Sequence, residues 1–179
     1  MKTNLIYLAA ASLLFACNST PEKTDEVVES TTIDLALSPK GNGKVKAQLR
    51  IFEQSGKVLI SGNFENLTQG KHGIHLHETG DCSADDASSA GGHWNPTNEA
   101  HGKWGVAPFH RGDIGNFEAD KDGVATIEFK TDLWCIGCGD PVKDILGKTV
   151  IIHAGEDDCT SQPSGNAGAR VACGVIVKN

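Results

Sequence analysis

The stretch that most clearly indicates the fold is VKAQLRI, residues 45–51, in which apolar and polar side chains alternate. Alternation with a period of two puts the apolar side chains on one face of a β-strand. Further alternating or apolar runs occur at residues 58–64, 74–77, 117–119, 124–129, 149–152 and 171–177. No stretch keeps a helical apolar period for three turns, so we predict an all-β domain, an eight-stranded Greek-key barrel or sandwich.

The segments between these strands carry two kinds of signal. Residues 120–123, Asp-Lys-Asp-Gly, separate two strand patterns and predict a hairpin, because glycine adopts positive φ without strain. Residues 80–112 and 155–169 have no strand pattern at all. Loops of that length in a compact domain are usually functional, so we expect two long functional loops.

The first thirty residues are expected to lie outside this fold. Lys2 and the apolar run that follows have the length of a signal-peptide core and are too short to span a bilayer. The run ends at Ala16-Cys17, which resembles a bacterial lipoprotein cleavage site. We therefore predict a signal peptide over 1–16, lipidation of Cys17 and a flexible acidic tether over 17–30. The alternative is an ordinary secretory peptide in which Cys17 is incidental; the domain over 31–179 is exported in both cases.

The net charge of the chain argues against one class of binding partner. The whole chain has a formal charge of −7, and the part from Thr31 onward, with 14 Lys and Arg against 19 Asp and Glu, has −5. A negative domain without a basic cluster argues against nucleic acid as a partner. After Cys17, no second apolar stretch is long enough to span a membrane.

Six of the seven histidines have spacings typical of metal ligands. His75 and His77 are two residues apart on a predicted strand, so their side chains project from one face and can share an ion. Four more candidates, in the first long loop and the strand of residues 149–152, are His93, His101, His110 and His153. Imidazole suits copper and zinc, and three histidines with Asp113 would make a closed tetrahedral zinc site.

Three motifs resemble the signatures of the Cu/Zn superoxide dismutase family. They are GIHLHETGDCS at residues 73–83, GHWNP at 92–96 and GNAGARVACGV at 165–175. The resemblance extends over roughly residues 31–179 and includes the spacing of the loop ligands. It implies the family's barrel fold, one copper and one zinc ion per subunit, and superoxide as the substrate.

The resemblance also implies a role for each ligand. Copper is expected at His75, His77, His93 and His153, and zinc at His93, His101, His110 and Asp113. His93 would then be a bridging imidazolate, an anion that two cations stabilise. Asp157 matches a carboxylate that links His75 to His101 and orients both rings. His72 matches no ligand and is expected to be structural.

The function implied is the disproportionation of superoxide to dioxygen and hydrogen peroxide outside the cytoplasm. One superoxide reduces the copper and a second reoxidises it, and His93 is expected to deliver a proton. Arg170 matches the family's anion-guiding arginine; its charge is permanent and its planar group can bind a small anion. Without the resemblance to this family, a single arginine in a glycine-rich loop would be interpreted as an ordinary surface charge.

The six cysteines divide into three groups. Cys17 is assigned to lipid, and the resemblance implies a disulfide between Cys82 and Cys173, which export permits. Cys135, Cys138 and Cys159 are extra. A local disulfide between Cys135 and Cys138 is favoured over pairing of Cys159 with one of them, and one thiol is left over in either case.

Two other functions remain to be compared with the enzyme. A non-enzymatic copper-binding or copper-delivery module on this fold would be expected to lack a copper ligand or Arg170, and neither is missing. A structural zinc sandwich would leave His75, His77 and His153 unexplained. The sequence leaves open whether the protein is a monomer or a homodimer, and whether a lipid anchor would lie on the periplasmic or the outer side of the cell envelope.

Overall fold

The computed structural model describes residues 31–178 and contains eight strands and one short 3₁₀ helix. Residues 1–30, with the predicted signal peptide, Cys17 and tether, lie outside the described range, as does Asn179. Within this range no helix is long and apolar enough to cross a membrane. The elements are β1 (Thr32–Pro39), β2 (Lys46–Gln54), β3 (Lys57–Glu65), β4 (Gly70–His77), η1 (Ser88–Ala90), β5 (Gly115–Ala119), β6 (Ala125–Thr131), β7 (Thr149–His153) and β8 (Arg170–Val175).

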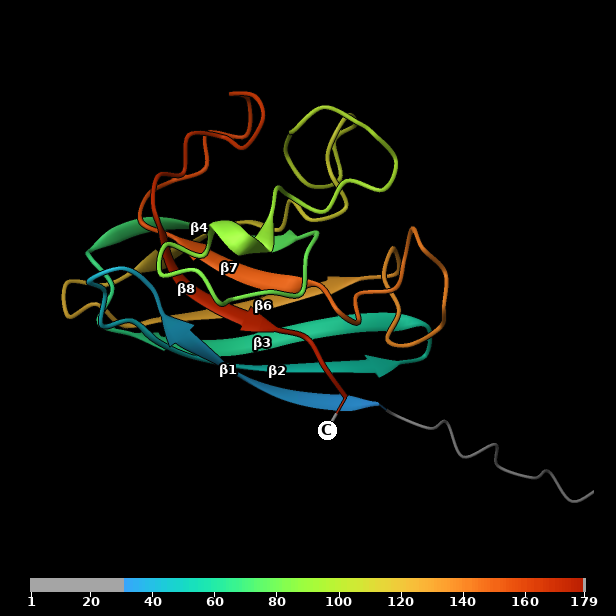
Figure 1. Ribbon diagram of the computed structural model, residues 1–179, viewed down its shortest axis with the longest axis horizontal. Coiled ribbons are helices and arrows are strands. Elements are labelled where there is room, and N and C mark those ends of the chain that lie inside the picture. Colours follow the sequence, from blue (N-terminus) through green and yellow to red (C-terminus); the bar gives the residue numbers. More distant parts are fainter. Residues whose placement is uncertain (1–30, 179) are drawn as a thin grey trace, which may run out of the picture.

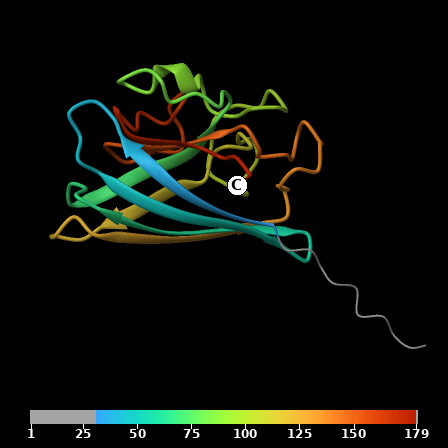
Figure 2. The same cartoon turned by 60° about the horizontal axis from the view of Figure 1, so that its bottom comes forward.

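The strands form one antiparallel sheet in the order β5-β4-β7-β8-β1-β2-β3-β6. The sheet curls until its two end strands, β5 and β6, come into contact, which makes a nearly closed barrel (Figures 1 and 2). The predicted all-β Greek-key architecture is therefore confirmed.

Alternation explains how the core forms. On β2, Ala47, Leu49 and Ile51 point inward and are almost completely buried, whereas Lys46, Gln48 and Arg50 are exposed. β3 contributes Val58, Ile60 and Phe64 to the same core. Burial of this apolar surface is the main favourable contribution to folding.

Three features differ from the prediction or were missed by it. β1 was not recognised, although Ile33, Leu35 and Leu37 alternate there and are buried. The turn at residues 120–123 forms, with Gly123 at φ 74°, but the predicted hairpin pairing is wrong. β5 pairs with β4 and β6 pairs with β3, because the turn joins the two ends of the curled sheet.

The third feature is a long loop over residues 132–148, between β6 and β7. The Cys135–Cys138 disulfide closes it locally, as favoured from the sequence. The carboxylate of Asp144 accepts hydrogen bonds from the backbone N–H groups of Gly137, Gly139 and Leu146. These contacts give the loop a defined shape without secondary structure.

Candidate metal centre

The histidines of the predicted site lie on two strands and one loop. His75 and His77 are on β4, which pairs with β7, and His153 ends β7. His93, His101 and His110 lie in the loop over residues 78–114, on the side of the barrel where the second loop, 154–169, also lies. Figure 1 shows the two loops over the β4–β7 part of the sheet. Because the loops cover this face, β4 is buried on both sides rather than alternating.

The first group of candidate ligands is His75, His77, His93 and His153. One ring nitrogen from each lies within 4.8 Å of all the others. In each of these rings one buried nitrogen has no hydrogen-bond partner: Nδ1 of His75 and Nε2 of His77, His93 and His153. Buried polar atoms are nearly always paired, so four unpaired nitrogens at one point fit a metal ion. A set of four imidazoles suits copper.

The opposite nitrogen of each ring is held by the protein. Nε2 of His75 lies 2.8 Å from Oδ2 of Asp157, and Nδ1 of His77 lies 3.0 Å from the carbonyl oxygen of Gly91. Nδ1 of His153 lies 3.2 Å from the carbonyl oxygen of Gly168. Such partners fix the tautomer, so that the lone pair of each ring points to the centre of the group.

The second group is His93, His101, His110 and Asp113, again with ligand atoms within 4.8 Å of one another. Oδ1 of Asp113 lies 2.8 Å from Nδ1 of His93, 3.1 Å from Nδ1 of His101 and 3.2 Å from Nδ1 of His110. Oδ2 of Asp113 is occupied separately, by the backbone N–H groups of Gly102 and His110. Three imidazoles and one carboxylate fit a closed tetrahedral zinc site.

His93 is the one residue that belongs to both groups. It contributes Nε2 to the first group and Nδ1 to the second. A backbone bridge between His77 and His93 holds the loop against the end of β4 at this point. His93 therefore lies between the two groups of candidate ligands.

Asp157 connects the two groups behind the ligands. Its Oδ2 lies 2.8 Å from Nε2 of His75 and its Oδ1 lies 2.9 Å from Nε2 of His101. Gly165 packs directly on this carboxylate: a Cβ there would lie 1.8 Å from Oδ1 of Asp157, and its φ is +69°. The glycine of the third sequence motif is thus required both by space and by backbone conformation.

Burial sets the protonation of three of the four histidines in the first group. It lowers the pKa of His75 to about 4, of His77 to about 2 and of His153 to about 3, which leaves neutral rings with free lone pairs. For Asp113 and Asp157, burial alone would raise the pKa, but hydrogen bonds from the histidines outweigh it and lower both values. Both carboxylates are therefore ionised.

His101 has the opposite shift. Burial opposes its protonation, but hydrogen bonds to Asp113 and Asp157 and their negative charge outweigh burial and raise its pKa to about 9. The two carboxylates thus attract positive charge to the second group. A divalent cation there would satisfy the same attraction that the proton does.

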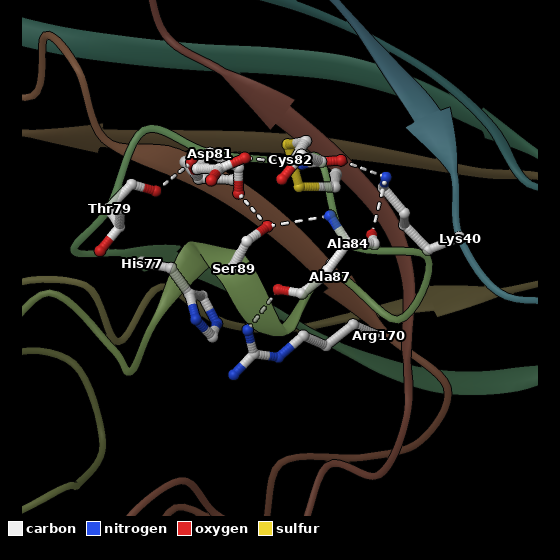
Figure 3. The surroundings of a disulfide bond; sticks show 12 residues. Lys40, His77, Thr79, Asp81, Cys82, Ala84, Ala87, Ser89 and Arg170 are labelled. Atoms are coloured by element: carbon white, nitrogen blue, oxygen red, sulfur yellow. Dashed lines mark hydrogen bonds between the residues drawn. A yellow bond between two sulfur atoms is a disulfide. The ribbon is translucent and has the colours of Figure 1, made fainter.

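A pocket of about 390 Å³ leads to the first group of histidines. His77, His93, His153 and Arg170 are among the residues that line it. The guanidinium of Arg170 donates hydrogen bonds of 2.7 Å to the carbonyl oxygens of Ala87 and Gly91, so its position is fixed. Figure 3 shows Arg170 and His77 on the same side of the segment that contains Ala87.

A disulfide between Cys82 and Cys173 ties this segment to β8, as the resemblance implies. Figure 3 shows its surroundings: Lys40 donates to the carbonyl oxygens of Cys82 and Ala84. Ser89 donates to the carbonyl oxygen of Asp81, 3.1 Å away. The segment that contains Ala87, one of the two residues whose carbonyl groups hold Arg170, is therefore anchored by several contacts.

Some residues near the site had no sequence signal. Asn116, on β5, pairs its side-chain amide with both backbone groups of Asp157, each at 2.8 Å. His72 is buried, with ring nitrogens 2.8 Å from the carbonyl oxygens of His153 and Thr68, in agreement with its expected structural role. The thiol left over is Cys159, whose backbone N–H donates to Oδ1 of Asp157.

Comparison with known proteins gives consistent results. The sequence profile described as "Copper/zinc superoxide dismutase (SODC)" matches residues 42–176. Superoxide dismutase [Cu-Zn] A of Xenopus laevis is 41% identical over 76% of this chain and 91% of its own length. The copper chaperone for superoxide dismutase of Rattus norvegicus is 35% identical over 78% of this chain, but the chain spans only 51% of that protein.

Among solved structures, the crystal structure of the clock protein EA4 is similar, with a TM-score of 0.71. It is 32% identical and covers 81% of this chain and 92% of that one. The matched dismutases of Xenopus laevis and Mesembryanthemum crystallinum are covered over 91% and 89% of their length, unlike the chaperones. The chain belongs to the copper/zinc superoxide dismutase family.

Proposed function

We propose that this protein catalyses the disproportionation of superoxide to dioxygen and hydrogen peroxide, with one copper and one zinc ion per chain. The observation that carries the proposal is that His93 offers one nitrogen to each of two complete ligand groups. A zinc site alone would leave the unpaired nitrogens of His75, His77 and His153 without a function.

Copper, when bound by the first group, would supply the one-electron redox chemistry that superoxide disproportionation needs and that zinc lacks. His75, His77 and His153 would hold it with neutral rings whose orientation is fixed by Asp157 and backbone carbonyl groups. His93 lines the pocket and contributes Nε2 there, so Nε2 is the atom that would carry a proton for the substrate whenever it does not hold copper.

The second group would keep His93 in place. Asp113 holds Nδ1 of His93 in the second group while its own Oδ2 is fixed by two backbone N–H groups. Arg170 lines the pocket with a permanent charge and would attract the anionic substrate. Its two hydrogen bonds to carbonyl groups keep the charge at a constant place beside the pocket.

The test pairs metal analysis with a superoxide consumption assay on the purified chain. We expect about one copper and one zinc per chain and a dismutation rate that depends on copper. His75→Ala should abolish activity while zinc is retained, and Asp113→Ala should release zinc while copper still binds. Two zinc ions per chain in a preparation supplied with ample copper, together with no activity, would refute the proposal.

A copper-delivery module is the second candidate, because copper chaperones are among the similar proteins. It differs in a measurable way: a delivery module passes its copper to an acceptor and turns over little superoxide. Copper that stays bound to this chain during many turnovers supports the enzyme. Transfer of copper from this chain to an apo-dismutase, with no superoxide turnover by this chain before the transfer, supports delivery.

We also propose that the protein is exported and held at the bacterial cell envelope by a lipid on Cys17. The support is the apolar run that ends at Ala16-Cys17 and the polar segment after it. The full chain should sediment with membranes and incorporate labelled fatty acid, and Cys17→Ala should do neither. A wild-type chain that is freely soluble after processing would contradict the anchor.

A further inference from the structure

The side chain of Gln162 makes an unusual pair of contacts with His101. Its Oε1 accepts a hydrogen bond of 2.9 Å from the backbone N–H of His101, and its Nε2 donates one of 3.0 Å to the carbonyl oxygen of the same residue. Nε2 also donates to the carbonyl oxygen of Thr160, 3.1 Å away. The amide thus occupies both backbone groups of His101, as a neighbouring strand would.

This contact connects the two long loops. Gln162 belongs to the loop over residues 154–169 and His101 to the loop over 78–114, and the two residues are 61 positions apart in the sequence. Neither long loop has a β-ladder of its own around these two residues. The orientation of the His101 ring therefore depends on side-chain contacts: Asp157 at its Nε2 and Gln162 at its backbone.

The side-chain amide of Asn116 makes the same pair of hydrogen bonds with Asp157, one to the backbone N–H and one to the carbonyl oxygen. Asn116, however, stands on β5 and so ties Asp157 to the barrel. Gln162 stands on a loop and ties one loop to another. The His101–Asp157 hydrogen bond is thus fixed from both sides by amide side chains, one of which belongs to no strand.

We propose that Gln162 is a positioning residue for the zinc site: it orients His101 and couples the loop that ends at Arg170 to the ligand loop. The inference rests on the proposed zinc site but not on dismutation. Contacts that orient a metal ligand typically change metal affinity by about 10- to 100-fold when they are removed. Gln162→Ala should therefore weaken zinc binding by about that factor and copper binding much less, because copper is reached only through Asp157 and His75.

The chemistry requires an amide at this position. Gln162→Glu keeps the acceptor for the backbone N–H of His101 but replaces the donor by a negative oxygen that faces a carbonyl group. It should preserve part of the protection of that N–H and still weaken zinc binding. Gln48→Ala is the matched control, because Gln48 is exposed on β2 and makes no side-chain hydrogen bond among the described residues.

The experiment uses the purified full chain and three readouts. The first is zinc affinity by competition with a chelator. The second is the visible spectrum of Co²⁺ bound in place of zinc, which reports ligand geometry and is not altered by a general loss of stability. The third is hydrogen exchange of the His101 amide in the metal-free protein, which Gln162→Ala should accelerate by at least about tenfold, by analogy with the loss of an orienting contact.

The outcomes separate this inference from the proposed function. Weaker zinc binding, a changed cobalt spectrum and faster amide exchange in Gln162→Ala, with Gln48→Ala like wild type, support the inference whether or not the protein is a dismutase. A folded Gln162→Ala variant with wild-type zinc affinity and cobalt spectrum overturns it. An equal loss of copper and zinc in that variant also overturns it, because it would indicate a general effect on the fold.

Discussion

The first group of candidate ligands is built from rings that each use one nitrogen for the protein and leave the other free. His75, for example, faces Asp157 with Nε2 and leaves Nδ1 buried and unpaired. Because a protein group holds one nitrogen of each ring, the other nitrogen points in a fixed direction. A neutral histidine thereby becomes an oriented ligand rather than an ordinary buried polar group. Small changes beside Asp157 should therefore alter the metal affinity of both sites.

Gly165 gives the sharpest test at this scale. In Gly165→Ala the new Cβ would lie 1.8 Å from Oδ1 of Asp157 and 2.7 Å from Nε2 of His101, so the Asp157–His101 contact must break. We expect both metal affinities to fall by about 10- to 100-fold, measured by chelator competition. Gly56→Ala is the control: its φ of +70° is equally unfavourable for alanine, but it lies in the turn between β2 and β3 and no atom lies within 4 Å of the new Cβ. Equal losses in the two variants would contradict the explanation.

The sequence predicted the metal ligands of the site but not the amide side chains that hold them in place. The ligands could be identified because His75, His77 and the later histidines follow a spacing that a known family shares. Asn116 and Gln162 could not, because a side-chain amide that binds backbone groups 41 or 61 positions away leaves no periodic pattern. Asp157 was identified only through the resemblance, since spacing alone gives a single aspartate no role.

At the scale of elements, strand alternation predicted most of the barrel but not how the sheet closes. Asp120 and Gly123 correctly predicted a turn, yet β5 and β6 belong to opposite ends of the sheet. Local sequence determines the turn, whereas the pairing follows from how eight strands curl around one core. β1 was missed although Ile33, Leu35 and Leu37 alternate, and only its pairing with β2 and β8 in the structure reveals it.

The two disulfides close loops of very different length, and we therefore expect them to contribute unequally to the stability of the domain. Cys82 and Cys173 are 91 positions apart, so opening their bridge frees a long loop and should destabilise the domain by about 4–5 kcal/mol in the chain-entropy model. Cys135 and Cys138 are 3 apart and should contribute only about 2 kcal/mol in the same model.

Thermal unfolding of Cys82→Ser and Cys138→Ser measures this difference. Cys82→Ser should have much the lower melting temperature and should also release the segment that holds Arg170. Cys138→Ser should lower the melting temperature by about half as much or less, because the closed loop is short and Asp144 also holds it. A larger effect of Cys138→Ser than of Cys82→Ser would contradict the account.

Charge is a property of the whole molecule. The part of the chain from Thr31 onward has a formal charge of −5, although the proposed substrate is an anion. At physiological ionic strength charges are screened beyond about 8 Å, so distant carboxylates matter less at the pocket than Arg170 does. Steering by local charge can raise association rates by about 10- to 1000-fold, an effect already known for superoxide dismutases.

The prediction for this acidic chain is that the second-order rate with superoxide falls as salt is added. Arg170→Ile should lower the rate and flatten its dependence on salt, since the variant removes the fixed cation that lines the pocket. Stopped-flow rates over a range of ionic strengths measure both. A wild-type rate that rises with salt would mean that the net charge dominates, and the guiding role of Arg170 would be wrong.

The two metals should also stabilise the whole domain. Without them, the four imidazole nitrogens of the first group are buried and unpaired, and each such group costs about 1–3 kcal/mol. Removal of both metals with a chelator should therefore lower the melting temperature by at least about 10 °C. Calorimetry of the same sample before and after reloading checks this; an unchanged melting temperature would argue against bound metals in this place.

The central claim is that His93 lies between two different metal ions. Anomalous X-ray diffraction from crystals of the metal-loaded chain, collected at the copper and zinc absorption edges, tests it directly. We expect copper on the Nε2 side of His93, among His75, His77 and His153, and zinc on the Nδ1 side, beside Asp113. A single metal, or zinc on both sides of a His93 ring in crystals grown with ample copper, would contradict it.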